Sequence, residues 1–521
     1  MNPPMISQPL VRFTPVICML ALCLSNVQAQ TNFPKREFRG AWVATVANID
    51  FPSKAGLDED KFKSEWTEIM RFLSEAGFNA VFAQVRPAGD AFFDSRIAPW
   101  SKYLSGKQGV RPDGQFDPLA FMVASAHQHN LEFHAWLNPY RAAMDTLNTQ
   151  LAPMHPANHH PEWFMNYGGK RYFNPARPEV RDYITEVVLE ILMDYEVDGI
   201  HFDDYFYPYP TGAEVLPDKG DFAVYGYGFF SIEDWRRHNI DLMIAQVSQM
   251  IKRVAPHVKF GISPFGVWRN ISKDPVYGSE TRAGINTYDD LYADVRSWLE
   301  KGWLDYVAPQ LYWNIGFPAA DYEVLLKWWQ KNAFDRHLYI GHAAYKVNNQ
   351  EPAWKRPDEI PKQLRMNRST DNVLGSIYYN ANSLQKNSLG FMDSIRSYYA
   401  YPALLPEMPF LKLPPAEAPL AGKPRLKKDK LQLHCRIKNP ASTNCVVVYK
   451  FEGRQTGDFN DAGNILEVVR LNGRKKIIFE DAEVIKGKTY TYAFAATNHA
   501  HQESPLGKSR VVEVKRLRLT K

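Results

Sequence analysis

From about residue 36 to residue 401, two hydrophobic patterns alternate along the chain. Short apolar runs rich in β-branched and aromatic residues are typical of buried strands. Longer segments with apolar residues every three to four positions separate them and are typical of amphipathic helices. The runs span 37–46, 79–87, 131–139, 197–207, 259–267, 304–313, 338–346 and 373–381. The clearest predicted helices span 60–76, 118–130, 178–195, 232–255 and 288–301.

Two of these helices have recognisable start signals. Pro178 suits the first turn of a helix, where a missing N–H costs nothing. Ser231 is followed three residues later by Asp234, a pattern close to a capping box. We therefore expect helices to begin at residues 178 and 232.

Eight strand–helix units in sequence predict an α/β fold of the (β/α)8 TIM-barrel type with long insertions, over residues 30–401. A doubly wound parallel sheet is the alternative. That fold needs fewer strands and usually a glycine-rich turn after the first one. The residues at that point, Asn48-Ile49-Asp50-Phe51-Pro52, cannot cradle a pyrophosphate. The pattern thus favours the barrel.

The C-terminal part has a different pattern. Six prolines between residues 402 and 419 predict a stiff linker over 402–417. Beyond it, seven short strand-like runs are separated by turn residues: 423–427, 431–437, 445–451, 465–470, 475–479, 488–496 and 509–516. This spacing predicts an all-β immunoglobulin-like or fibronectin type III-like sandwich over 418–521.

The N-terminus has the features of an export signal. Arg12 precedes an apolar run from Phe13 to Leu24, and small residues follow up to Ala29. The run is too short to span a bilayer, so we expect a signal peptide over 1–29 and a periplasmic, cell-surface or secreted protein. The mature chain would keep Cys435 and Cys445, and the sequence allows either a disulfide or two free thiols.

Composition and charge narrow the classes of function. With 45% hydrophobic residues the chain can bury a sizeable core, which excludes a disordered or fibrous protein. A net charge of +5 is too small to indicate nucleic-acid binding. From residue 418 onward, however, 21 Lys and Arg face 10 Asp and Glu. This basic module is a candidate contact for an anionic envelope polymer, although a charged face is usually only solvated.

Candidate catalytic residues lie at the end of the fourth strand, since barrel active sites form at the carboxyl ends of the strands. With the two-residue period of a strand, His201 and Asp203 share one face. Asp203 should then point into the barrel mouth and Asp204 toward its rim. We expect Asp203 to be catalytic and His201 to tune it by hydrogen bonding. The alternative is that both aspartates pair with Arg86 or Arg141 and only brace the barrel.

Glycoside hydrolysis needs two carboxyl groups around one bond. The sequence leaves the second one open, with Asp204 and Asp90 as the first candidates and Glu280 and Asp94 behind them. Asp90 follows a glycine after the second strand and can reach the mouth, but capping the next turn is an equally good role for it. Arg86 can hold a carboxylate in a bidentate fork.

Aromatic and polar residues gather near the other strand ends. Sugars pack their C–H faces on aromatic rings and present hydroxyls to polar side chains. The expected substrate-binding residues, besides Arg86 and His201, are Trp42, Trp136, Asn138, Arg141, Tyr205, Trp268, Gln310, Tyr312, Trp313 and Asn380. No phosphate-binding loop or Gly-x-Ser-x-Gly motif occurs, and His155, His159 and His160 do not have helical zinc spacing. We expect no metal and no cofactor.

Several segments, in order along the chain, resemble the bacterial glycosyl hydrolase-like family 10: residues 39–43 (RGAWV), 84–91 (QVRPAGDA), 136–141 (WLNPYR), 199–205 (GIHFDDY), 263–266 (SPFG) and 309–313 (PQLYW). The resemblance implies a (β/α)8 hydrolase of the cell envelope, and characterised relatives cut peptidoglycan strands whose stem peptides have been removed. It also implies Asp203 and Asp204 as the acidic centre, with Arg86, Asp90, Asn138 and Gln310 as pocket residues.

The first hypothesis is therefore an exported glycoside hydrolase acting on peptide-stripped peptidoglycan or a related N-acetylhexosamine glycan. A non-catalytic carbohydrate-binding barrel is the alternative, because the second carboxyl group is not identified. A third hypothesis is an envelope scaffold that docks through its basic C-terminal module. The linkage and the anomeric outcome stay open.

Overall fold

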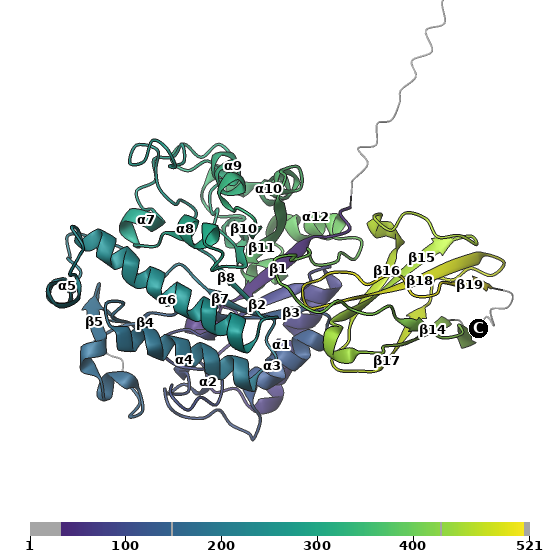
Figure 1. Cartoon of the computed structure of the whole chain (residues 1–521), viewed down its shortest axis with the longest axis horizontal. Helices are drawn as coiled ribbons and strands as arrows, with labels where there is room; N and C mark the ends of the chain where they lie inside the picture. The colour runs from purple at the N-terminus through teal and green to yellow at the C-terminus, as the bar shows by residue number, and fades with distance from the viewer. Residues whose placement is uncertain (1–32, 147–149, 428–429, 515–521) are drawn as a thin grey trace, which may run out of the picture. The chain divides into compact units, whose positions relative to one another are not determined.

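The computed structural model describes residues 33–146, 150–427 and 430–514, so the expected signal peptide lies outside the described residues. Eight parallel strands close into a barrel in the order β1-β11-β10-β9-β8-β7-β3-β2 (Figure 1). They are β1 (Phe38–Val43), β2 (Ala80–Arg86), β3 (Glu132–Leu137), β7 (Gly199–Phe202), β8 (Lys259–Ile262), β9 (Tyr306–Val307), β10 (His337–Ala343) and β11 (Val373–Tyr379). The prediction of a (β/α)8 barrel is confirmed, and the doubly wound alternative is excluded.

Seven of the eight strands lie within the predicted segments and are shorter than predicted, while β10 begins one residue before its predicted segment and ends three residues before its predicted end. Every residue of β1, β2 and β3 is buried, as expected for strands covered on both faces. The fourth predicted strand ends early, at Phe202, and the polar residues after it begin a long loop. The alternation that would separate Asp203 from Asp204 therefore stops before either residue.

Glycines make room for large side chains inside the barrel. A Cβ on Gly199 would lie 2.3 Å from His134 Nδ1, and one on Gly261 would lie 2.3 Å from the Tyr306 ring. His134 and Tyr306 fill this space and are hydrogen-bonded to each other at 3.0 Å. The barrel interior is thus packed below its mouth, as in other barrels of this type.

Helices surround the ring of strands (Figure 1). The longer ones are α1 (Glu59–Glu75), α3 (Pro118–Gln128), α4 (Pro178–Asp194), α6 (Ile232–Val254), α9 (Tyr322–Asn332), α10 (Glu359–Arg368) and α12 (Phe391–Tyr398). Both start signals are confirmed, because Pro178 lies in the first turn of α4 and Ser231 Oγ accepts a 3.1 Å hydrogen bond from the Asp234 N–H.

The predicted continuous helix over 288–301 is wrong. The structure has two short helices there, α7 (Thr287–Asp290) and α8 (Val295–Glu300). Tyr292, between them, has a left-handed backbone with φ of 52°, which an α-helix cannot contain. Asp294 then starts α8 by accepting a 3.2 Å hydrogen bond from the Ser297 N–H.

Long loops at the carboxyl ends of the strands form additional elements. After β3 the chain forms a small antiparallel sheet of β4 (Arg141–Ala143), β5 (Phe164–Tyr167) and β6 (Lys170–Phe173). After β7 it forms α5 (Lys219–Tyr225), and after β11 it forms α11 (Ala381–Lys386). The hydrophobic pattern did not predict the small sheet, which supplies part of the barrel mouth.

The C-terminal part consists of two antiparallel sheets. One contains β12 (Leu420–Ala421), β13 (Arg425–Lys427), β14 (Lys430–Arg436) and β17 (Lys476–Asp481), and the other contains β15 (Cys445–Glu452), β16 (Ile465–Arg470), β18 (Thr489–Thr497) and β19 (Arg510–Glu513). The all-β architecture is confirmed, while a fibronectin type III-like topology stays a prediction. Cys435 and Cys445 are both free thiols.

The described residues from Phe33 onward form one compact unit, with the β-sandwich against the amino ends of the barrel strands. Asp198, just before β7, pairs with Arg470 of β16 at 2.5 Å. Glu132, the first residue of β3, pairs with Lys259 of β8 at 2.5 Å and with His501 at 2.8 Å. These side chains are nearly fully buried. The sandwich therefore covers the amino end of the barrel and leaves the carboxyl ends of the strands uncovered.

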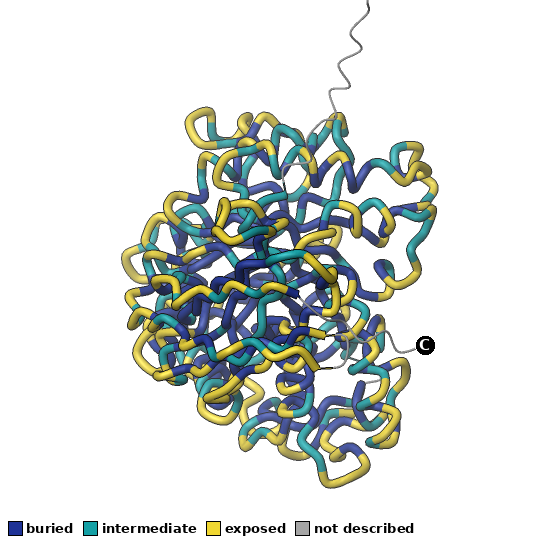
Figure 2. Tube along the Cα trace, turned by 90° about the vertical axis from the view of Figure 1, so that its right-hand side faces the viewer, coloured by how far each residue is buried: buried dark blue, intermediate teal, exposed yellow. Residues whose placement is uncertain are grey.

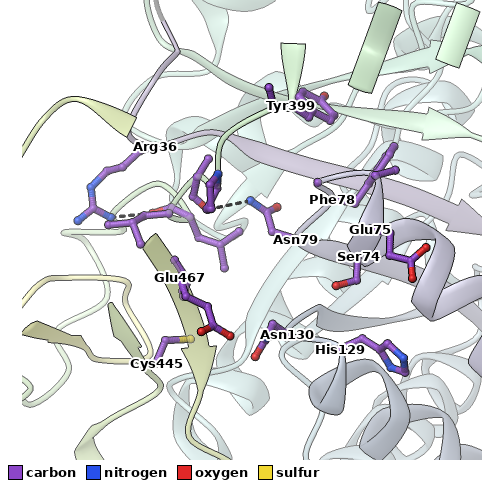
Figure 3. Close-up of a pocket in the computed structure, with 18 of the residues that line it drawn as sticks. Arg36, Ser74, Glu75, Phe78, Asn79, His129, Asn130, Tyr399, Cys445 and Glu467 are labelled. Carbon is purple, nitrogen blue, oxygen red and sulfur yellow. Dashed lines mark hydrogen bonds between the residues drawn. The ribbon is translucent and has the colours of Figure 1, made fainter. Parts of the chain in front are cut away.

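The proline-rich segment runs along the boundary between the barrel and the β-sandwich. The Glu37 N–H donates a 2.9 Å hydrogen bond to the Leu404 carbonyl, and both Leu404 and Met408 are buried (Figure 2 shows the distribution of burial along the trace). A cavity of about 450 Å³ lies along this boundary. Figure 3 shows Glu75 and Asn130 of the barrel across it from Glu467 of the sandwich.

Candidate active site

A cavity of about 570 Å³ opens at the carboxyl ends of the barrel strands. All eight strands, or the loops that directly follow them, contribute to its lining. In chain order these contributions include Trp42, Gln84, Trp136, Asp203, Ser263, Gln310, Tyr345 and Tyr379. The cavity therefore lies where the fold brings all eight strand ends together, which is the usual active-site position in this architecture.

Asp203 and Asp204 immediately follow β7 and both line this cavity. They are only 3% and 6% exposed. The Asn138 side chain donates a 3.0 Å hydrogen bond to Asp203 Oδ2, and the Tyr205 N–H donates one of 3.3 Å to Oδ1. The Tyr209 hydroxyl donates to Asp204 Oδ2. Asp203 thus has two donors and Asp204 has a different one.

Burial changes the titration of both carboxyl groups. Loss of water raises the pKa of Asp203 to about 7, with the nearby Arg141 acting against this and the Asp204 charge adding to it. Burial also raises the pKa of Asp204, while the hydrogen bond from Tyr209 lowers it. The pair therefore retains a proton near neutral pH, which suits one proton donor beside one ionised partner.

Among the described residues, no salt bridge joins Asp203 or Asp204 to Arg86 or Arg141. The Arg141 guanidinium instead lies 4.2 Å from the centre of the Tyr205 ring, and its Nη1 donates a long 3.5 Å hydrogen bond to the Pro87 carbonyl. The alternative prediction, in which both aspartates form ion pairs with Arg86 or Arg141 and have only a structural role, is therefore not observed.

Aromatic side chains form much of the cavity wall. They are Trp42, Trp136, Tyr205, Tyr209, Phe265, Tyr312, Trp313, Tyr345 and Tyr379. The Tyr312 ring lies 6.2 Å from that of Tyr379, and Phe265 meets Trp313 edge-on at 5.3 Å. Because these rings pack against one another, their faces are fixed before a ligand arrives. Such a wall suits the flat C–H faces of sugar rings.

His201 supports the floor of the cavity and does not line it. Its pKa lies well below the ordinary value because it is fully buried, so the ring is neutral. The Trp42 indole N–H lies 3.3 Å from His201 Nε2, and the Ser263 hydroxyl lies 2.9 Å from the same nitrogen. Nε2 therefore accepts and the Nδ1–H points to the Tyr306 hydroxyl at 3.1 Å. His201 acts by positioning Trp42 and Ser263.

Of the other expected site residues, Asn138 reaches the site through its hydrogen bond to Asp203, while Arg86 and Asp90 do not line the cavity. The Arg86 guanidinium lies between the rings of Phe173 and Tyr183, at 5.6 and 5.4 Å. Asp90 is buried in the loop after β2, which raises its pKa to about 6, and accepts a 3.3 Å hydrogen bond from the Ala88 N–H. The loop turns the Asp90 carboxyl group toward its own backbone.

Trp268 and Asn380 also lie away from the cavity. Trp268 stacks on Trp328 at 5.6 Å and donates a 3.2 Å hydrogen bond to Asp294, so it belongs to the outer core. The Asn380 side chain accepts a 3.2 Å hydrogen bond from the Ser383 N–H and starts α11. The remaining expected residues line the cavity: Trp42, Trp136, Arg141, Tyr205, Gln310, Tyr312 and Trp313.

Sequence reasoning missed several lining residues. Tyr209, Phe265, Tyr345 and Tyr379 supply rings, and Lys170 and Lys346 supply positive charge. Tyr379 and Phe265 lie near the carboxyl ends of predicted strands and could have been found there. Lys170 lies in the small sheet after β3, whose contribution to the mouth has no signal in the hydrophobic pattern.

Within residues 33–146, 150–427 and 430–514, no three His, Cys, Asp or Glu side chains are placed to hold a metal ion. Of the three clustered histidines, His155 is buried and accepts a 3.1 Å hydrogen bond from the Ala157 N–H. No described helix is both long and apolar enough to cross a membrane.

Comparison of the sequence with known protein families and proteins identifies the class of protein to which this site belongs. Residues 37–356 match the family described as glycosyl hydrolase-like 10. The chain belongs to this family. It is 42% identical over 483 residues to glycosyl hydrolase YngK of Bacillus subtilis (strain 168), which covers 91% of this chain and 93% of that protein. It is 40% identical over 389 residues to glycosyl hydrolase DigH of Escherichia coli (strain K12), with 70% and 87% covered.

Among solved structures, this glycosyl hydrolase-like 10 chain is similar to the glycoside hydrolase domain of PgaB (BpsB) from Bordetella bronchiseptica. The identity is 14% and the TM-score 0.47, with 70% of this chain and 99% of that one covered. The family and the names of the sequence relatives confirm the prediction of a glycoside hydrolase.

Proposed function

We propose that this chain is an exported enzyme that hydrolyses glycosidic bonds in a bacterial cell-envelope glycan, either peptide-stripped peptidoglycan strands or a related N-acetylhexosamine polymer. The observation that carries the proposal is the pair Asp203 and Asp204, two buried carboxyl groups exposed only to an aromatic-walled cavity. Family membership supports the reaction class. The signal-like pattern over 1–29 supports export.

In the proposed reaction, Asp203 is the proton donor. Its raised pKa, about 7, keeps the proton available near neutral pH. As the bond from the anomeric carbon to the leaving oxygen breaks, that oxygen takes the Asp203 proton. A water then adds its hydroxyl to the anomeric carbon and returns one proton to the site. The products are two shorter glycans.

Asp204 is the proposed ionised partner. The Tyr209 hydroxyl donates to it, which favours the charged form. The transition state of glycoside hydrolysis has positive charge at the anomeric carbon. A carboxylate beside that carbon lowers the energy of the transition state. The effect is larger in a cavity poor in water than in bulk solvent. Asn138, by donating to Asp203, fixes the orientation of the donor.

The test is digestion of peptide-stripped glycan strands by the wild type and by Asp203→Asn, with products measured by mass spectrometry. Loss of a general acid lowers the rate by about 10²–10⁴-fold. Asp335→Asn is the matched control, because Asp335 is exposed and lies outside the cavity lining. Equal digestion by wild type and Asp203→Asn would remove Asp203 from the mechanism.

The non-catalytic alternative has its own signature. A carbohydrate-binding barrel would bind the same strands in calorimetry, with identical heats for wild type and Asp335→Asn, and would release no new reducing ends. We expect new reducing ends from the wild type.

A further inference from the structure

The cavity that contains Asp203 and Asp204 also has positive charge. Its described lining includes Arg141, Lys170 and Lys346, against those two carboxyl groups alone. Since burial keeps a proton on the aspartate pair near neutral pH, the positive charges exceed the negative ones there. The chain up to residue 417 has the opposite balance, with 41 Lys and Arg against 47 Asp and Glu. A positive mouth in an acidic body indicates an anionic ligand.

Arg141 is the buried member of this cationic set. It is the first residue of β4 and is only 5% exposed. Its guanidinium stacks on Tyr205, and its Nη1 donates a long hydrogen bond to the Pro87 carbonyl. No Asp or Glu in the described chain lies within salt-bridge distance of it. A buried guanidinium without a direct ion-pair contact is costly, and its planar fork matches a carboxylate.

Lys170 lies on the same loop. It is the first residue of β6, directly after the turn formed by Gly168 and Gly169, whose φ values of 57° and 70° suit glycine. Strand pairing of Tyr167 with Lys170 closes this turn, so the backbone of Lys170 is fixed. Its ammonium group has no carboxylate partner in the part of the chain that is described. It remains available to a ligand.

Lys346 lies on the other side of the mouth. It follows β10, which is four strands away from β3 in the closed ring of eight. Its Nζ is 3.6 Å from Glu351 Oε1, so its charge is already partly balanced. Arg141 and Lys170 are therefore the two cations of the lining that make no salt bridge within the described residues, and both lie on the loop after β3, next to β7 and its aspartates.

Resting on the proposed function, we propose that Arg141 and Lys170 bind a free carboxylate carried by a sugar of the glycan. The guanidinium fork would donate hydrogen bonds to the two carboxylate oxygens, with the ammonium group as a second contact. A peptide joined to that carboxylate through an amide removes the charge and adds bulk. The cation pair thus selects strands whose sugar carboxylates are free, which gives a physical reason for acting after the peptides have been removed.

Lys170→Gln is the most informative variant, because Arg141 also lowers the pKa of Asp203 and its replacement would disturb the catalytic pair directly. The assay measures kcat/KM on peptide-stripped peptidoglycan strands and on the same strands after methyl esterification of their carboxylates. Lys331→Gln is the control, since Lys331 is an exposed lysine on α9 outside the cavity lining. Lys170→Arg keeps the charge and serves as the rescue variant.

We expect esterification to lower kcat/KM of the wild type and of Lys331→Gln by roughly 10- to 100-fold, the usual effect of losing a hydrogen bond to a charged group. Lys170→Gln should lose activity on native strands, and esterification should then lower its kcat/KM by a clearly smaller factor than it lowers that of the wild type, because only the Arg141 contact is left to lose. Lys170→Arg should recover most of the activity on native strands. This non-additivity identifies a direct contact between the lysine and the carboxylate.

Two results would overturn this proposal. One is equal hydrolysis of native and esterified strands by the wild type, and the other is the same loss for Lys170→Gln on both substrates. Failure of the proposed function looks different, because the wild type would then cleave neither substrate. In that case calorimetric binding of native and esterified fragments to the wild type still decides the matter, and equal affinity contradicts carboxylate recognition.

Discussion

At the residue scale, burial decides the protonation of the two aspartates. Asp203 has a pKa of about 7 because the cavity removes water from it, and the proposed mechanism uses its protonated form. The rate of glycan cleavage should therefore fall as the pH rises through about 7. The check is the pH dependence of kcat/KM, and a rate that keeps rising above pH 8 would exclude Asp203 as the acid.

Tyr209 should control the acidic limb of the pH profile of kcat/KM. Its hydroxyl donates to Asp204 and lowers the pKa of that carboxyl group, which burial raises. Tyr209→Phe should raise the pKa of Asp204 and move the acidic limb of the kcat/KM profile to higher pH, with the alkaline limb shifted less. An unchanged acidic limb would mean that Asp204 does not act in its ionised form.

The same carboxyl group affects folding stability. An unfolded aspartate titrates near 3.9, whereas Asp203 in the folded chain titrates at about 7. Between these pH values the unfolded state releases its proton first, so the free energy of unfolding decreases as pH rises. The free energy of unfolding of Asp203→Asn should exceed that of the wild type by on the order of 1–3 kcal/mol at pH 8 and should match it at pH 4.

Urea unfolding at the two pH values measures this difference, with Asp335→Asn as the variant that should change neither. A destabilised Asp203→Asn at pH 8 would contradict the buried-carboxyl account. We expect the Asp203 carboxyl group to lower the stability of the folded chain at pH 8 while it is required for activity.

Residue-level prediction from sequence succeeded mainly where a side chain lies at the carboxyl end of a strand or in the few residues after it. Trp42, Trp136, Asp203, Asp204 and Gln310 are such residues, and all line the cavity. Arg86 and Asp90 also follow a strand, but the loop after β2 folds back and buries both away from the cavity. The direction of a loop depends on tertiary packing, which a hydrophobic pattern does not contain.

At the element scale, close contacts between strands fix the barrel. A Cβ on Gly375 of β11 would lie 2.1 Å from the Phe38 carbonyl oxygen of β1, which is backbone and cannot move alone. Gly375→Ala should therefore lower the free energy of unfolding by about 1–3 kcal/mol or more. Gly220→Ala on α5 is the control, since a Cβ there meets nothing within 4 Å.

Thermal unfolding followed by circular dichroism compares the two glycine variants. We expect a lower Tm for Gly375→Ala and an unchanged or slightly higher Tm for Gly220→Ala, because alanine favours a helix over glycine. Equal Tm values for both variants and the wild type would show that β1 and β11 can move apart to admit a Cβ at residue 375 without loss of stability.

The elements themselves were largely predictable. The eight barrel strands are buried on both faces, which produces continuous apolar runs that the sequence displays clearly. The break at Tyr292 was not predictable, because apolar spacing continues through it while the backbone turns left-handed. The small sheet of β4, β5 and β6 was missed because its strands are only three or four residues long.

At the scale of the whole molecule, buried charges join the sandwich to the barrel. Arg470 of β16 pairs with Asp198 at 2.5 Å, and Asp198 also contacts His127 at 2.8 Å. Arg470→Met would leave Asp198 short of one partner, and breaking a buried pair this way costs about 3–5 kcal/mol. Calorimetry should show one unfolding transition for the wild type and a clearly lower Tm for Arg470→Met.

Arg425→Met is the matched control, since Arg425 is exposed on β13 and has no salt bridge in the described chain. Two separate transitions in the wild type would contradict a single cooperative unit. The sequence predicted two modules and a stiff linker, but it could not show that the boundary between the modules is closed by buried ion pairs.

The most direct test of the central claim, that Asp203 protonates the leaving oxygen, varies the leaving group. Wild type and Asp203→Asn are compared on natural glycan strands and on a dinitrophenyl glycoside of the same sugar, whose leaving group needs no proton. The account predicts a loss of about 10²–10⁴-fold for Asp203→Asn on the strands and a loss of less than about tenfold on the dinitrophenyl glycoside. An equal loss on both substrates, or none on the strands, would contradict it.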